Sequence, residues 1–145
     1  MKKIFVLLFV FVSYNAFAQA DTTAISSLKN WINSFNEKNL EKTLSYVSDE
    51  YIGYFPEQQD QFYETLKELY TKIFSNDKLN ITLKYFVNDF TTDNNLTVVR
   101  LIITTVAKPT FAQQAQSIKE KGIQIWRKEN NQWKLFRSVT FPITK

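Results

Sequence analysis

Two arginines stand among apolar residues in the carboxy-terminal half of the sequence. Arg100 lies between Val98 and Ile102. Arg137 is in phase with an otherwise apolar set, Trp133, Leu135, Val139 and Phe141. A guanidinium on an apolar strand face needs an anionic partner or a route to solvent. The pattern predicts binding of a small carboxylate or of an amphipathic molecule with a flat apolar body; the alternatives are an ion pair within the protein or a side chain that reaches the rim.

Other residue types that carry chemistry are scarce. The chain has no histidine and no cysteine, which removes thiolate nucleophiles, disulfides and the usual nitrogen and sulfur ligands of metals. The remaining carboxylates, such as Asp60 and Glu64, are spaced like solvated charges at helix ends. Gly53 and Gly122 are the only glycines and are isolated, so no phosphate-binding loop can form. We expect no metal and no cofactor.

The elements that must position these residues begin with helices. Apolar residues recur at three- and four-residue spacing from Thr22 to Val47, which predicts an amphipathic helix in two pieces. The break falls at residues 36–39, where Asn39 is expected to cap the second piece. A short extended segment from Tyr51 to Pro56 follows, and helical spacing returns from Gln61 to Phe74.

Four β-rich segments complete the chain. Leu79 to Phe90 and Leu96 to Ala107 flank the polar turn 91–95, and Gln116 to Lys128 and Gln132 to Phe141 flank residues 129–131. Helices followed by an antiparallel meander predict an α+β fold with the helices on one face of a strongly curved antiparallel sheet. The 96–106 segment is apolar on both alternating sets, so we expect a homodimer that pairs through the uncovered face.

The amino terminus has the pattern of a secretory signal. Three features predict cleavage after Ala18: the basic start Met1–Lys3, an apolar run from Ile4 to Val12, and small residues at Ala16 and Ala18. Without a cysteine, the mature protein cannot be a lipoprotein. We therefore expect a periplasmic or secreted protein that is not held at the membrane after cleavage, with residues 19–145 forming one domain.

The charge of the mature chain is low. The formal net charge is +4, and it falls to +2 when Lys2 and Lys3 leave with the signal. Acidic and basic residues are interspersed along the chain. This balance argues against nucleic acid as a partner.

The order of these elements resembles that of the SnoaL-like and nuclear-transport-factor-like superfamily, as a secreted bacterial branch. The resemblance rests on the segment Asn36–Glu41 between two helices and on the ending Ile125–Phe136 around a polar turn. It spans nearly all of the mature chain. What it implies is a cone of helices and curved sheet around a central pocket, which relatives use for isomerases, dehydratases, cyclases, ligand sensing or protein contacts.

The resemblance also proposes residues for the pocket. The ketosteroid-isomerase branch uses a tyrosine and two aspartates, and their positions fall on Trp31, near Phe55 and near Gln124, so those catalytic roles are lost. Candidates for the inward-facing set are Trp31, Phe35, Tyr51, Phe55, Arg100, Gln124, Trp126 and Arg137.

These observations favour an exported domain that binds a small apolar or weakly acidic ligand without catalytic residues. Two alternatives stay open. One is an isomerase- or cyclase-like enzyme that uses unusual pocket groups, such as Asp89 or a tyrosine with Arg137, and it requires a carboxylate inside the cone with a raised pKa. The other is a partner-protein module whose cone is filled by its own side chains.

Overall fold

The computed structural model describes residues 23–56 and 58–143. The expected signal peptide lies outside these residues. Three helices and six strands follow in the order α1 (Ala24–Asn36), α2 (Leu40–Ser45), β1 (Val47–Tyr54), β2 (Gln61–Phe62), α3 (Tyr63–Phe74), β3 (Leu79–Asp93), β4 (Leu96–Pro109), β5 (Gln116–Glu129) and β6 (Gln132–Pro142). The chain is therefore α+β, with its helices preceding the long strands, as the sequence predicted.

The two-piece amino-terminal helix is confirmed. The Thr23 side chain caps α1 by accepting from the Ser26 backbone N–H at 3.1 Å, and the Asn39 side chain caps α2 by accepting from the Lys42 N–H at 3.0 Å. Between the helices Lys38 has a positive φ of 55°. Each cap satisfies one of the backbone donors that a helix leaves free at its start, which fixes where the helix begins.

The six strands form one open sheet in the order β2-β1-β6-β5-β4-β3. β3 to β6 form the expected antiparallel meander, but β1 pairs with β6 in parallel, so the sheet is mixed rather than antiparallel throughout. A parallel pair needs a long crossover between its strands. Here β2, α3 and the first three strands of the meander separate β1 from β6, so β1 can join the edge of the meander in that direction.

Two of the three hairpins of the meander, β3–β4 and β5–β6, turn on asparagine. Asn130 and Asn131 have φ values of 49° and 64°, as a two-residue type I′ turn requires, and Asn94 has a φ of 48°. The strands flanking Asn94 extend to Asp93 and Leu96, so the turn is shorter than the five polar residues suggested. Asparagine tolerates the left-handed region, which allows the strands to continue up to the turn.

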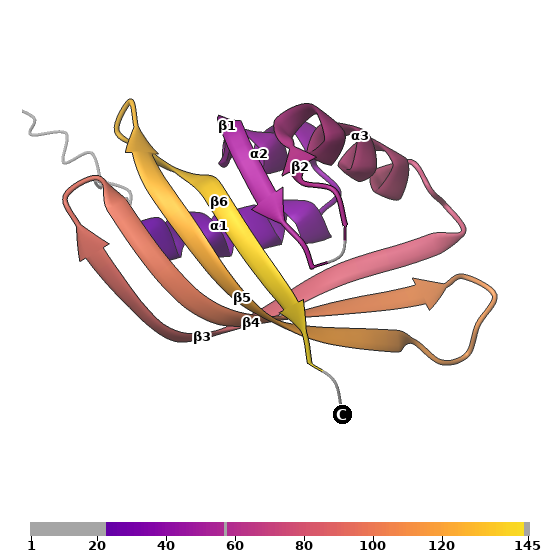
Figure 1. The fold of residues 1–145 in the computed structure, drawn as a ribbon. Helices are drawn as coiled ribbons and strands as arrows, with labels where there is room; N and C mark the ends of the chain where they lie inside the picture. Colours follow the sequence, from indigo (N-terminus) through magenta and orange to yellow (C-terminus); the bar gives the residue numbers. More distant parts are fainter. Residues whose placement is uncertain (1–22, 57, 144–145) are drawn as a thin grey trace, which may run out of the picture.

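The sheet curves strongly, and α1 lies across its concave face, as Figure 1 shows. The core lies between the two. Leu28, Trp31, Ile32 and Phe35 of α1 are all at most 5% exposed, and Trp126 of β5 is fully buried. In the part of the chain described here, no helix is long and apolar enough to cross a bilayer.

Candidate ligand-binding site

The helices and the concave face of the sheet enclose a cavity of about 550 Å³. Its apolar walls include Trp31 and Phe35 of α1, Leu66 and Tyr70 of α3, and Leu83 and Ile103 of the sheet. Small-molecule sites in proteins have volumes of about 300–1,000 Å³ and are mostly apolar. The cone is therefore hollow rather than filled by its own side chains.

An aromatic cluster forms the wall between α1 and α3. The Phe35 ring meets the rings of Tyr70 and Phe74 edge to face, with centroid distances of 5.2 and 5.0 Å, and Tyr70 stacks on Phe74 at 5.9 Å. Such pairs add to the apolar burial that already joins the helices. This packing holds α3 over the concave face and keeps that wall in place.

Neutral polar groups are set into the apolar lining. The hydroxyls of Tyr51 and Ser138 lie 2.8 Å apart and join β1 to β6. The Gln124 side-chain oxygen accepts a hydrogen bond from the Trp126 indole N–H at 3.1 Å. Trp31 also lines the cavity, and its indole N–H is buried with no hydrogen-bond partner among the described residues. The cavity thus contains donors that the protein itself does not fully use.

The tyrosines of the cavity stay protonated at neutral pH. Burial raises the pKa of Tyr51, against the smaller opposing effect of its hydrogen bond with Ser138. Burial also raises the pKa of Tyr70 well above its usual value, and the nearby Tyr51 adds to that shift. Both phenols are therefore neutral hydroxyl groups, and neither can serve as a base.

The rim of the cavity is polar on one side and apolar on the other. The segment between β1 and β2 contributes Gln58, Gln59 and Asp60. Asp60 is exposed and is the one carboxylate among the described lining residues. Phe62 and Leu69 also belong to the lining and are 54% and 42% exposed, so the entrance has an apolar side.

Five of the eight residues proposed from the sequence line this cavity: Trp31, Phe35, Tyr51, Phe55 and Gln124. They come from α1, β1, the segment after β1, and β5. Trp31, Phe55 and Gln124 are the positions that the resemblance aligned with catalytic groups. None of the three carries a carboxylate.

Trp126 lies behind the lining instead of in it. Its side chain is fully buried, its ring meets Trp31 edge to face at 6.5 Å, and its N–H is taken by Gln124. Trp126 therefore supports two lining residues from the core.

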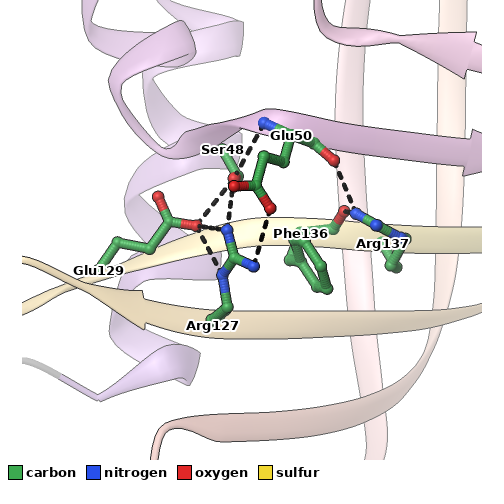
Figure 2. Close-up of polar contacts among 6 residues, drawn as sticks. All are labelled: Ser48, Glu50, Arg127, Glu129, Phe136 and Arg137. Atoms are coloured by element: carbon green, nitrogen blue, oxygen red, sulfur yellow. Dashed lines mark hydrogen bonds and ion pairs between the residues drawn. The ribbon is translucent and has the colours of Figure 1, made fainter.

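Arg137 points away from the cavity, contrary to the alternation read from the sequence. A β-bulge in β6 leaves Phe136 unpaired, because Trp126 pairs with Leu135 and Ile125 with Arg137. The extra residue shifts the alternation, so Ser138 joins Leu135 in the lining while Arg137 faces outward. Its guanidinium lies 3.6 Å from the Phe136 ring centroid and donates to the backbone oxygens of Glu50 and Phe136, each at 2.7 Å (Figure 2).

A polar network joins β1 to the last hairpin near this bulge (Figure 2). Arg127 donates to Glu129 at 2.6 Å and to Glu50 at 3.1 Å, and Ser48 donates to Glu129 at 2.8 Å. Burial pushes the pKa of Glu129 upward, but the hydrogen bonds from Ser48 and Arg127 and the charges of Arg127 and Lys134 outweigh it and lower the pKa. On β1, the network uses Ser48 and Glu50, which lie where the β1–β6 register shifts between Val47 and Ile52.

Arg100 is also outside the cavity. It forms a bidentate pair with Asp89 of β3, and both side chains are more than half exposed on the outer face of the sheet. Its strand neighbours Val99 and Leu101 are buried, so strand alternation turns Arg100 outward. The two arginines do share a face, as the sequence allowed, but it is the outer one. Asp89 is therefore outside the cone as well.

Several lining residues were not predicted from the sequence. Ser138 and Thr140 enter the lining only because of the bulge at Phe136. No residue type in the sequence indicates that bulge. Leu66, Tyr70 and Ile73 were expected on a helix but not at the cavity. Their three- and four-residue spacing gave the signal for a buried face, without indicating what that face covers.

The sequence matches no protein-family model and no curated protein. Solved structures share the fold. A conserved protein from Planctomyces limnophilus superposes with a TM-score of 0.72 at 12% identity, covering 82% of this chain and 94% of that one. A ketosteroid isomerase-like protein from Erwinia carotovora superposes with a TM-score of 0.66 at 14% identity, covering 84% of this chain and 95% of that one.

A nuclear transport factor 2-like superfamily protein from Salmonella enterica serovar Typhimurium gives a TM-score of 0.65 at 17% identity, with 83% of this chain and 88% of that one covered. Together these similarities show the fold of the chain. The chain has the nuclear transport factor 2-like, SnoaL-like cone fold that its sequence resembles.

Proposed function

We propose that this protein binds a small, largely apolar molecule in its cavity and does not transform it. The observation that carries the proposal is the cavity of about 550 Å³, walled by aromatic and aliphatic side chains. Apart from Asp60 at the rim, the polar groups of the described lining residues are uncharged: hydroxyls, side-chain amides and one indole. Neither arginine that could have balanced an acidic ligand lies among the lining residues, so a neutral ligand is favoured over a weakly acidic one.

Native mass spectrometry of the protein purified from the compartment in which it accumulates tests this proposal. A stoichiometric added mass is expected, and it gives the weight of the ligand. Ile103→Trp should displace that mass, because Ile103 lines the cavity. Ile102→Trp is the matched control, since strand alternation places Ile102 on the outer face. Retention of the mass by the Ile103 variant would place the ligand elsewhere and contradict the proposal.

One observation favours a second candidate, an isomerase- or cyclase-type enzyme. Glu120 of β5 pairs across the sheet with the lining residue Ile103, so it faces the concave side, and burial raises the pKa of its carboxyl group. A carboxyl group with a raised pKa suits a general acid or base. If this candidate is right, Glu120→Gln abolishes turnover of the bound molecule while its affinity changes little. Unchanged turnover in that variant excludes Glu120 from such a role.

We further propose that the mature protein is residues 19–145 and acts in the periplasm or outside the cell. The support is the basic start, the apolar run and the small residues before Gln19 in the sequence. Amino-terminal sequencing of the protein from cell fractions is expected to begin at Gln19. An intact Met1 on the accumulated protein would contradict export by this route.

We also propose that the outer face of the sheet pairs with a second copy. Phe86, Val98, Ile123 and Phe141 come from four adjacent strands and are 39–64% exposed on this face. An isologous contact would cover all four residues on both copies at once. Light scattering is expected to give a dimer for the wild type and a monomer for Ile123→Lys. Lys119→Glu, a charge change on the same strand away from these residues, should leave the dimer intact.

A further inference from the structure

Four lysines gather on the outer face of the sheet, toward the turn between β4 and β5. They are Lys84 of β3, Lys108 of β4, and Lys119 and Lys121 of β5, and all four are exposed. Thr104 pairs with Lys84 on one side and with Lys119 on the other. The four positions alternate along the paired strands with positions that face the cavity, so their side chains point away from it. These lysines form a basic patch.

The basic patch is not neutralised by carboxylates. None of its lysines forms an ion pair within the part of the chain that the structure describes. Glu120 stands between two of them in the sequence, but its pairing with Ile103 turns it to the concave side. Asp89 lies on the outer face and is already paired with Arg100. The patch therefore keeps its full positive charge.

The spacing of the lysines lets their charges act together. Lys84 and Lys119 lie on strands separated by one strand, so their backbones are about 10 Å apart, and Lys119 and Lys121 are about 7 Å apart along β5. These separations are close to the Debye length of about 8 Å at physiological salt. The formal charge of the whole chain is only +4. The local excess of charge thus arises because the strands bring distant lysines onto one face.

An exposed aromatic residue lies beyond the basic patch. Phe111 follows β4 in the turn to β5 and is 85% exposed. The β4–β5 hairpin extends past the end of β6, whose Pro142 pairs with Glu120 (Figure 1). Phe111 is therefore at the tip of a projecting arm, close in sequence to Lys108. Basic residues beside an exposed apolar side chain are typical of proteins that bind at the surface of an anionic bilayer.

We propose that the basic patch and Phe111 bind the surface of a bilayer that contains anionic phospholipids. The lysine ammonium group is a compact charge without the planar fork of arginine, so lysines suit a diffuse negative surface better than directed hydrogen bonding. The contact is peripheral and reversible, and it needs neither a lipid anchor nor a membrane-spanning segment. It lies outside the cavity and does not depend on what the cavity binds.

Co-sedimentation of the protein with phospholipid vesicles tests the proposal. The protein is expected to bind vesicles of equal parts phosphatidylglycerol and phosphatidylcholine, and not vesicles of phosphatidylcholine alone. Raising NaCl from about 0.05 M to about 0.5 M should release it, because the Debye length falls to about 4 Å. Equal binding to both kinds of vesicle, binding to neither, or binding that salt does not weaken overturns the proposal.

Two matched double variants locate the contact. Lys108→Gln with Lys119→Gln should weaken binding to the anionic vesicles about 25-fold, since each lysine near such a surface contributes about fivefold. Lys29→Gln with Lys72→Gln removes the same charge from α1 and α3, where both lysines are exposed, and should leave the affinity nearly unchanged. Equal weakening in the two double variants would mean that net charge alone is responsible, which contradicts the proposal.

Neither Lys108 nor Lys119 is among the residues proposed for pairing with a second copy. Light scattering should therefore give the wild-type mass for their double variant, and thermal unfolding should be unchanged because both side chains are exposed. These two measurements show that a loss of vesicle binding comes from the lysines themselves and not from a change of assembly or fold.

Phe111→Ser tests the aromatic part of the contact. It should weaken binding about fivefold, as expected when roughly half of a phenylalanine side chain leaves water at the bilayer. Phe90→Ser is the control, because Phe90 is 54% exposed toward the opposite end of the sheet. Equal affinity of the two variants contradicts the role of the Phe111 ring. Retention on immobilised heparin without binding to anionic vesicles would indicate a soluble polyanion as the partner and would overturn the proposal.

Discussion

The hydroxyl groups of Tyr51 and Ser138 lie 2.8 Å apart inside the cavity and join β1 to β6 across their parallel pairing. The two residues are 4% and 6% exposed. The bond thus belongs both to the cavity wall and to the attachment of the edge strands. It also places Tyr51 beside Gly53, where an added Cβ would lie 2.4 Å from the Tyr51 hydroxyl oxygen.

Tyr51→Phe is expected to lower the free energy of unfolding by about 1–3 kcal/mol, because it leaves the buried Ser138 hydroxyl without its partner. Ser138→Ala in the same background should add little, since the bond is already absent. Urea denaturation of the two single variants and the double variant measures this. Additive losses in the cycle would show that the two hydroxyls do not depend on each other.

Gly53→Ala is expected to destabilise the protein, because its Cβ would overlap the hydroxyl of Tyr51. Strain of this kind typically costs about 1–3 kcal/mol. Combining Gly53→Ala with Tyr51→Phe removes the overlapping oxygen and should recover part of the loss. Equal thermal midpoints for Gly53→Ala and the wild type would contradict the close approach.

Glu129 is expected to make stability depend on pH. Its pKa is lowered in the folded state, so its contribution is complete above the unfolded value of about 4.3 and is lost as the pH falls through the folded value. Glu129→Gln should therefore be less stable than the wild type at pH 7, and the difference should shrink below about pH 4. Denaturation from pH 3 to pH 7 checks this, and a difference that stays constant with pH would argue against the network.

Arg137→Met is expected to destabilise the protein by about 1–3 kcal/mol, because two backbone carbonyl groups lose a charged donor. Arg100→Met is the matched control on the same face. Its ion pair with Asp89 is exposed and screened by solvent, so thermal unfolding should change little. Ligand affinity is expected to be the same in both variants. A selective loss of binding in Arg137→Met would mean that the guanidinium reaches the ligand.

Asn39→Ala is expected to cost about 1 kcal/mol, because α2 loses the side chain that accepts the Lys42 N–H. Asn39→Asp keeps an acceptor at the same position and should restore most of the stability. Chemical denaturation of the two variants provides the comparison. Equal stability of the alanine and aspartate variants would contradict the capping role.

Local features of the fold could be predicted from the sequence because neighbouring residues determine them. Asn39 ends one helical pattern and begins another within a few residues, and Asn130 and Asn131 adopt the left-handed conformations of a tight turn. The inward direction of Trp31 and Phe35 follows from three- and four-residue spacing on one helix. These features need no knowledge of distant parts of the chain.

Simple strand alternation explains which face of the sheet Arg100 occupies, whereas the face of Arg137 depends on how distant strands pair. Arg100 faces outward because Val99 and Leu101 are buried, which simple alternation explains once the inner face is known. For Arg137 the alternation itself changes at the bulge, and the bulge exists only through the pairing of β6 with β5. The residue that seemed best suited to bind an anion therefore became part of the outer surface.

By itself the sequence determined the helices, the hairpin turns, the aromatic lining positions on α1 and the lack of histidine and cysteine, because these depend on residue type and short spacing. Only the tertiary structure decided the parallel β1–β6 pairing, the entry of Ser138 into the cavity and the burial of a Trp31 N–H that has no partner among residues 23–56 and 58–143. Each of these depends on which distant strand or side chain lies opposite, and a strand register shifted by one residue exchanges the two faces of the sheet.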